Sequence, residues 1–207
     1  EEPLDAAYWV RNLRDPVMFA PMVSGLIDQG VHVFMELDPH PVLAQALEQC
    51  LARAGKAGTV VASACRDEQG ATTLLEAAGA LVVAGVPVQL EPKAATADEQ
   101  PRSELVVLSA KTDAALSAQA AQLHRHLLAH PELELSELAL SLAVTRSPMD
   151  HRLALAASSR EPLLAALSLA AQGQTPAGSR RGSVQPSPHK IAFLFTGQGS
   201  QVVGMGR

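Results

Sequence analysis

The apolar positions up to residue 90 alternate between helical spacing and short continuous runs. Stripes at helical spacing predict helices that end at Gly30, Gly55 and Gly85, because glycine most readily takes the left-handed conformation that follows a helix. Continuous apolar runs predict buried strands at residues 31–37, 59–64 and 86–90. The run at 86–90 is the least marked of the three. Strands that alternate with helices of this length indicate an α/β layer structure with a largely parallel sheet.

A polar segment separates this pattern from a second one. Residues 91–102 (EPKAATADEQPR) hold two prolines, five charged side chains and almost nothing large and apolar, which is typical of a linker. A second α/β unit begins at Glu104, with strands predicted at residues 105–108 and 151–157. Hydroxyl side chains predict where the helices of this unit begin, at Thr112, Ser136 and Ser159.

The last part of the chain returns to a strand. Residues 174–190 are rich in proline, glycine and serine, which predicts a loop or a second linker. Residues 191–195 predict a strand that runs directly into the glycine turn at residues 196–201 (TGQGSQ).

Composition narrows the class of protein. Hydrophobic residues make up 47% of the chain and charged residues 18%, which is enough apolar material for a core. The formal net charge of −5 argues against a nucleic-acid-binding protein, which needs a basic surface to neutralise phosphates. No apolar stretch approaches the roughly 18 residues of a membrane span, and the first residues do not resemble a signal peptide. Cys50 and Cys65 give no disulfide framework, so we expect a cytoplasmic protein with reduced, buried thiols.

The glycine turn is the strongest local signal for chemistry. Gly197 and Gly199 let the backbone turn sharply at the end of a strand, which exposes N–H groups that can stabilise an oxyanion. The dinucleotide fingerprint G-x-G-x-x-G does not fit, because Val202 stands where its third glycine would be. A P-loop does not fit either, because no Gly-Lys-Ser/Thr follows. A simple turn at a strand end remains the alternative to a catalytic role.

A histidine pair is the other candidate for chemistry. His126 and His130 have the i, i+4 spacing that can hold zinc, but no acidic or cysteine ligand accompanies them. We therefore interpret them as part of a solvated helix face and expect no metal site.

Three segments together resemble one enzyme family. Residues 193–201 (FLFTGQGSQ) resemble the first strand and turn of malonyl-CoA:acyl carrier protein transacylases and of the acyltransferase domains of type I modular polyketide synthases. Residues 8–43, which begin YWVRNLRDPVMF, resemble the other end of the same domain. The segments LVVLSAKTDAAL and TRSPMDHRLALAASSREPLLAAL resemble the linker domain that precedes the acyltransferase.

This resemblance implies the domain organisation. The fold class is α/β, with partial acyltransferase segments (a hydrolase-like parallel sheet) flanking a small α/β linker domain. Residues 1–90 would be the C-terminal part of an acyltransferase, 91–103 a linker, 104–177 the ketosynthase–acyltransferase type of linker domain, and 178–207 a loop with the first strand and turn of a second acyltransferase.

The resemblance also implies roles for two residues. The backbone N–H of Gln198 would contribute to the oxyanion hole. The backbone carbonyl of Asn12 would orient the catalytic histidine by accepting its Nδ1–H, which leaves Nε2 free as the base. The two residues would serve separate active sites and would share no pocket within this chain. No cofactor would be bound, and the substrates would be acyl-CoA and the phosphopantetheine of an acyl carrier protein.

The central catalytic groups of that family are absent from this sequence. The family uses a serine in G-H-S-x-G, and no serine here has glycines two residues before and two after it. The partner histidine would lie upstream of YWVRN, and His40 falls in a structural turn of the resembling domain. We therefore expect the isolated chain to be inactive.

The order of the segments admits several origins. An acyltransferase tail, a linker domain and an acyltransferase head could come from tandem acyltransferases, an internal deletion or a misassembled reading frame. The alternative function is a non-catalytic spacer that holds neighbouring ketosynthase and acyltransferase domains, with residues 104–172 as its one complete domain.

Overall fold

The computed structural model describes residues 3–66, 70–89, 103–184 and 190–197. The helices and strands up to residue 83 are α1 (Ala6–Arg14), α2 (Phe19–Asp28), β1 (Val31–Glu36), α3 (Ala44–Ala54), β2 (Thr59–Ala62) and α4 (Gly70–Val83). Those that follow are β3 (Glu104–Ala110), α5 (Asp113–Ala129), α6 (Leu135–Thr145), β4 (His151–Ala157), α7 (Arg160–Ala171), β5 (Ser179–Ser183) and β6 (Lys190–Leu194).

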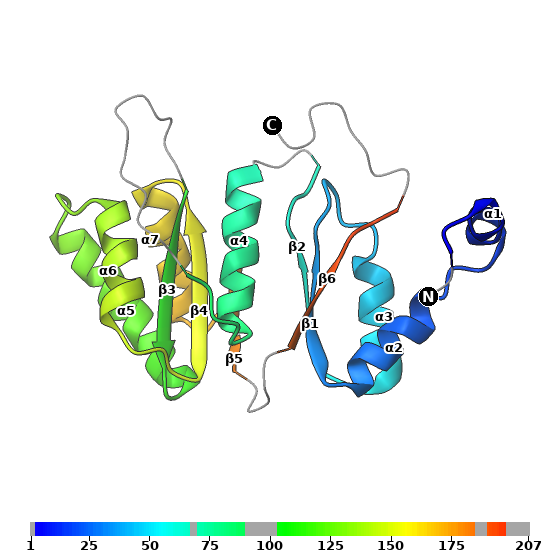
Figure 1. The fold of residues 1–207 in the computed structure, drawn as a ribbon. Coiled ribbons are helices and arrows are strands. Elements are labelled where there is room, and N and C mark those ends of the chain that lie inside the picture. The colour runs from blue at the N-terminus through cyan, green and yellow to red at the C-terminus, as the bar shows by residue number, and fades with distance from the viewer. Residues whose placement is uncertain (1–2, 67–69, 90–102, 185–189, 198–207) are drawn as a thin grey trace, which may run out of the picture.

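The first sheet is parallel and has the strand order β2-β1-β6 (Figure 1). Successive side chains of a strand point to opposite faces, so Phe34 of β1 packs on α2 and α3 while Met35 faces α4. On the α3 side, Phe34 and Leu47 are fully buried. The third strand, β6, comes from the far end of the described chain.

The second sheet is antiparallel and has the order β3-β4-β5. Alternation again divides its side chains: Val106 and Leu108 of β3 face a core formed with α5, α6 and α7, while Leu105 faces α4. This core is built almost entirely from leucine and alanine, as the scarcity of aromatic residues requires.

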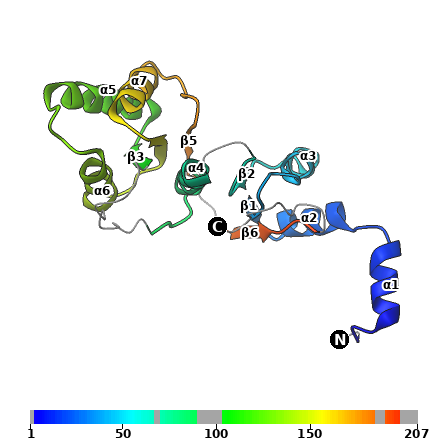
Figure 2. The ribbon, with the colours of Figure 1, turned by 90° about the horizontal axis from the view of Figure 1, so that it is seen from above.

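Helix α4 lies between the two sheets and packs against both (Figures 1 and 2). Ala77 and Ala80 contact the parallel sheet, whereas Ala78 and Val83 contact the antiparallel sheet. The layers therefore run from α2 and α3 through the parallel sheet, α4 and the antiparallel sheet to α5–α7. The two units therefore share one helix.

Most of the elements expected up to residue 83 are confirmed. The three predicted helices and the first two strands are present, and Gly30, Gly55 and Gly85 all have positive φ. The expected strand at 86–90 is wrong for residues 86–89, which the structure describes and which form no strand. The N–H of Val86 caps α4 by donating to the carbonyl of Leu81 at 2.9 Å, and a proline follows that has no N–H for a sheet.

Later expectations need corrections. Thr112 caps α5 as predicted, with its Oγ1 accepting from the N–H of Ala115 at 3.2 Å. Ser136 does not start its helix, because α6 begins at Leu135 after Glu134. Ser159 stands at the start of α7, but no side-chain capping bond is found there. Residues 179–183 form β5 and not a loop.

A substitution at Gly79 tests how closely α4 packs against the antiparallel sheet. A Cβ at this position would lie 2.8 Å from the Cβ of Ala154 and 3.2 Å from Leu105. We expect Gly79→Ala to lower the free energy of unfolding by about 1–3 kcal/mol, although alanine is the better helix former. Urea denaturation measures this change.

The matched control is Gly25→Ala in α2, where no described atom outside its own helix lies within 4 Å of the added Cβ. It is expected to be neutral or to stabilise by up to about 1 kcal/mol. If both variants were equally stable, α4 would not be packed tightly against β4.

Candidate functional site at the carboxyl edge of the parallel sheet

The carboxyl ends of β1, β2 and β6 meet at one edge of the parallel sheet, because the three strands run in the same direction. The turns at this edge are residues 37–43 after β1, 63–66 after β2 and 195–197 after β6. In open α/β sheets this edge is where ligands are bound. This edge of the parallel sheet is therefore the candidate functional site.

Asp38 connects the turn after β1 to both neighbouring turns. Its Oδ2 accepts a hydrogen bond from the N–H of Thr196 at 2.7 Å and a second from the hydroxyl of Thr196. The N–H of Asp38 donates to Oγ of Ser63 at 3.2 Å, and that hydroxyl donates to the carbonyl of Asp38 at 3.4 Å. One residue thus fixes the relative positions of three turns.

His40 and Cys65 form a second contact across this edge. The Sγ of Cys65 lies 3.8 Å from Nδ1 of His40, and the N–H of Arg66 donates to the same nitrogen at 3.3 Å. Nδ1 of His40 thus accepts a hydrogen bond from the backbone of the turn after β2. His40 fastens two turns together, in line with the structural role expected for it.

Glu36 is a buried carboxylate that the sequence analysis did not identify. Its side chain is 1% exposed, and its oxygens accept from the N–H groups of Val42 and Leu43 at 2.7–3.1 Å. These donors lie at the start of α3, where a negative charge is favourable. An acidic residue at the end of an apolar strand, a few residues before a helix, was the available signal.

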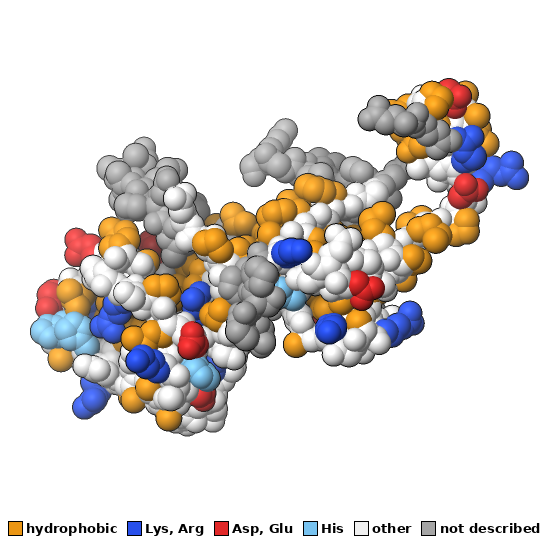
Figure 3. Space-filling view, turned by 60° about the horizontal axis from the view of Figure 1, so that its bottom comes forward, with side chains coloured by type: hydrophobic (Ala, Val, Ile, Leu, Met, Phe, Trp, Pro, Cys, Tyr) orange, Lys and Arg blue, Asp and Glu red, His pale blue; other side chains and the backbone are white. Residues whose placement is uncertain are grey.

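Of the two residues with predicted roles, the structure describes Asn12 and not Gln198. Asn12 lies on α1, all of which is described and none of which is buried. This helix stands apart from the parallel sheet, and apolar side chains are exposed along that end of the molecule (Figures 2 and 3). Gln198 lies outside the described residues. The roles of both residues stay predictions.

The second unit holds an open hollow of about 350 Å³ beside the start of α7, lined by Glu104, Glu134, Ser159, Arg160 and their neighbours. Arg160 is already occupied there: it donates to the carbonyls of Leu127 and Leu133. Because the guanidinium of Arg160 is used in these hydrogen bonds, we interpret the hollow as a feature of the packing and not as a binding site.

The histidine pair lies on the outside of this unit. The rings of His126 and His130 are 4.5 Å apart, and Nδ1 of His130 is 3.0 Å from Glu132. The pKa of Glu132 is lowered, first by a backbone hydrogen bond and then by the bond to His130.

Two kinds of feature are absent from the described ranges. They contain no group of three or more His, Cys, Asp or Glu side chains placed to hold a metal ion. They also contain no helix long and apolar enough to cross a membrane.

Two parts of the chain match family models, and both parts are similar to segments of polyketide synthases. Residues 1–88 match the family model of the acyl transferase domain, and residues 104–167 match the model described as CurL-like, PKS C-terminal. The chain is 44% identical over 110 residues to polyketide synthase GfsA of Streptomyces halstedii, which is 53% of this chain and 2% of that protein. It is 41% identical over 92 residues to erythronolide synthase EryA2 of Saccharopolyspora erythraea, covering 44% and 3% of the two chains.

One solved structure also aligns with part of the chain. The acyl transferase domain of ZmaA aligns with a TM-score of 0.47 at 32% identity and covers 54% of this chain and 24% of that one. Like the relatives above, it is matched over only a small part of its length.

The two cysteines provide a test of the edge geometry. Cys65 lies in a partly exposed turn, whereas Cys50 is 6% exposed inside the core between α3 and β1. We expect iodoacetamide to alkylate Cys65 of the native protein well before Cys50, because a buried thiol reacts only when the structure opens. Peptide mass spectrometry after timed quenching measures both rates.

In urea the two cysteines should react at similar rates, which serves as the control. Equal rates in the native protein would mean that the core around Cys50 is not formed.

Proposed function

We propose that the chain is a segment of a type I modular polyketide synthase, in which an acyltransferase segment is followed by a CurL-like C-terminal region, and that its parent transfers acyl groups from coenzyme A to an acyl carrier protein. The chain spans only 2–3% of the curated relatives named above, so the substrates and partners of the whole enzyme form part of this proposal. The observation that carries it is that the two family matches fall on the two units that α4 joins.

The proposed reaction has two half-reactions. A serine hydroxyl of the parent attacks the thioester carbonyl of a malonyl-type or starter acyl-CoA, and the thiol of coenzyme A leaves. The phosphopantetheine thiol of the carrier protein then attacks the serine ester, which releases the serine. In each half-reaction negative charge develops on the carbonyl oxygen, and the N–H of Gln198 is proposed to stabilise it.

Asn12 has a supporting part in this proposal. Its backbone carbonyl would hold the histidine base in the correct tautomer. The sequence contains neither the G-H-S-x-G nucleophile motif nor a residue matching that histidine, so the isolated chain is proposed to be inactive.

A spacer function is the second candidate, and one observation favours it. Residues 103–184 have their own leucine-rich core, and α4 ties this unit to the parallel sheet over the helix's length. Arg152 of β4 reinforces this attachment by donating from Nη1 to the carbonyl of Val82 in α4 at 2.6 Å. Such an arrangement would hold an acyltransferase at a fixed distance from its neighbour.

Incubation with labelled malonyl-CoA tests the proposed inactivity. We expect intact-mass measurement to find no acyl adduct on this chain, because an ester needs the serine nucleophile that is missing. An intact type I acyltransferase domain in the same reaction is the positive control. A stoichiometric serine ester on this chain would overturn the assignment.

Limited proteolysis compares the two functions. If α4 is shared by both sheets, a fragment that contains residues 70–83 should stay bound to residues 103–184 after native cleavage and gel filtration, because Ala77, Ala80 and Val83 are buried. A stable core that begins only at residue 104 would support a free-standing spacer and contradict the shared helix. Protection of residues 8–66 as well would show that the acyltransferase segment folds in this context.

A further inference from the structure

We propose that His126 and His130 form a two-ligand site for a divalent transition-metal ion, with Glu132 orienting the second imidazole. The site lies at the carboxyl end of α5, on the outside of the second unit, and it is independent of the proposed acyl transfer. The sequence alone favours a solvated helix face without a metal. The contact between His130 and Glu132 in the structure changes that interpretation.

The helix places both imidazoles on one face. Residues four positions apart in an α-helix are neighbours on its surface, and two histidines at this spacing bind zinc in proteins with the H-E-x-x-H motif. His126 is in the last turn of α5, His130 is its C-cap residue, and both are exposed. Figure 3 shows histidine side chains on the outer surface of this unit. A metal ion can therefore reach both rings from solvent.

The separation of the two rings fits one shared ion. Their centroids are 4.5 Å apart, and their planes are tilted by 46°. Two imidazoles that bind one ion at about 2.1 Å, with a right angle between the two bonds, have their centroids roughly 4.5 Å apart. Rotation of the two side chains is then enough to aim one nitrogen of each ring at the same ion, and α5 does not have to move.

Glu132 determines which nitrogen of His130 is available. Its Oε1 lies 3.0 Å from Nδ1 of His130. A backbone hydrogen bond, and then the bond to His130, lower the pKa of Glu132, so this carboxylate is ionised and can only accept. Nδ1 of His130 therefore donates, and the lone pair of the neutral ring is on Nε2. A carboxylate that holds the other nitrogen of a ligating histidine is the usual outer-shell arrangement of metal sites.

The turn that carries His130 is fixed by hydrogen bonds. Arg160 donates to the carbonyl of Leu127 at 2.8 Å and also to the carbonyl of Leu133. The N–H of Leu133 donates to the carbonyl of His130 at 3.4 Å. Ligands that are already positioned lose less conformational entropy when they bind.

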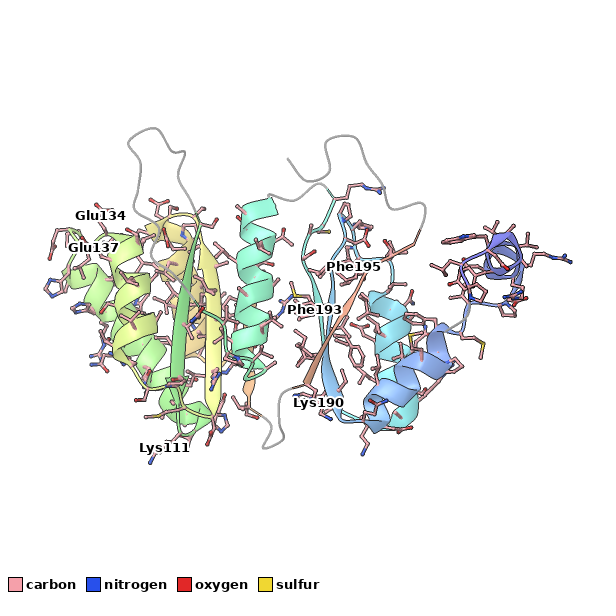
Figure 4. The ribbon with its side chains drawn as sticks, viewed as in Figure 1. Lys111, Glu134, Glu137, Lys190, Phe193 and Phe195 are labelled. Atoms are coloured by element: carbon pink, nitrogen blue, oxygen red, sulfur yellow. The ribbon has the colours of Figure 1, made fainter. Side chains whose placement is uncertain are left out.

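Local charge also favours a cation at this position. The carboxyl end of a helix carries partial negative charge. Besides Glu132, the chain places Glu134 and Glu137 at the start of α6, and Figure 4 shows both at the same end of the unit. The charge of Arg160 opposes a second cation. Its influence is the weaker one, because it lowers the pKa of Glu132 less than the backbone hydrogen bond and the bond to His130 do.

The ligand type selects the class of ion. Imidazole suits Ni²⁺, Cu²⁺ and Zn²⁺, whereas Mg²⁺ and Ca²⁺ prefer oxygen ligands. The described ranges hold no group of three or more side chains placed for a metal, so water would complete the coordination. We therefore infer an open site that exchanges its ion, in contrast to the closed four-ligand sites that stabilise a fold.

Calorimetric titration of the untagged chain with Ni²⁺ tests the site. We expect one ion to bind per chain with micromolar affinity. His126→Gln and His130→Gln should each weaken binding by roughly tenfold or more, because a single imidazole loses the effective concentration that the second one provides. The matched control is His124→Gln, which removes a histidine from another face of the same helix and should leave the affinity unchanged.

Two further measurements separate the roles of the residues. Glu132→Gln should weaken binding by about tenfold, the low end of the usual effect of an outer-shell carboxylate, because the pair is largely exposed. Ni²⁺ should raise the urea midpoint of the unmodified chain and not that of His126→Gln, since unfolding of the last turn separates the two ligands. Urea denaturation without metal shows that each variant is folded.

Two outcomes would overturn the proposal. An unchanged affinity in His126→Gln would mean that Ni²⁺ binds elsewhere on the chain. Saturation only at millimolar Ni²⁺ would mean that the two imidazoles do not act together. Neither measurement involves acyl transfer, so failure of the metal site would leave the proposed function standing, and an acyl adduct would leave the metal site standing.

Discussion

The burial of α4 on two opposite sides is the constraint on which the rest of the structure depends. A helix between two sheets needs small side chains on both faces, and α4 supplies them with Ala77, Ala80 and Gly79. Arg152 crosses from β4 to the end of this helix. Its burial lowers the pKa of the guanidinium, and its hydrogen bonds to the carbonyls of Val82 and Met149 offset the loss of solvation. Because α4 belongs to both units, the distance between the two sheets is fixed.

The carboxyl edge depends in turn on the buried carboxylate of Glu36. By accepting from two N–H groups at the start of α3, it closes the turn that begins at Leu37. That turn places Asp38 within reach of Ser63 and of Thr196. This buried polar side chain is accommodated because both of its oxygens accept hydrogen bonds from backbone N–H groups at the start of α3. The position of the candidate site thus depends on the hydrogen bonds between Glu36 and the start of α3.

Sequence periodicity was sufficient to predict the helices and strands whose apolar face is continuous, such as α2, β1 and α5. It missed α1, which has no buried residue, and β5, whose SRRGS sequence is polar. In β5 the side chain of Arg181 is largely buried. Its guanidinium bonds to Asp113, Ser117 and the carbonyl of Ala170, and these bonds offset the free-energy cost of removing the charge from water. The contact between Asp38 and Thr196 could not be predicted, because it depends on a strand order that joins residues 158 positions apart.

The pairing of β6 with the parallel sheet cannot rest on its polar contacts alone. Ordering residues 190–197 costs about 1–2 kcal/mol of backbone entropy per residue, which is on the order of 10 kcal/mol in all. Hydrogen bonds to a charged group such as Asp38 contribute about 1.5–3 kcal/mol each. The remainder must come from burying Ile191, Ala192 and Leu194 and from the short connection between β5 and β6, which reduces the entropy that the free strand has to lose. The polar contacts therefore select the register, while apolar burial holds the strand.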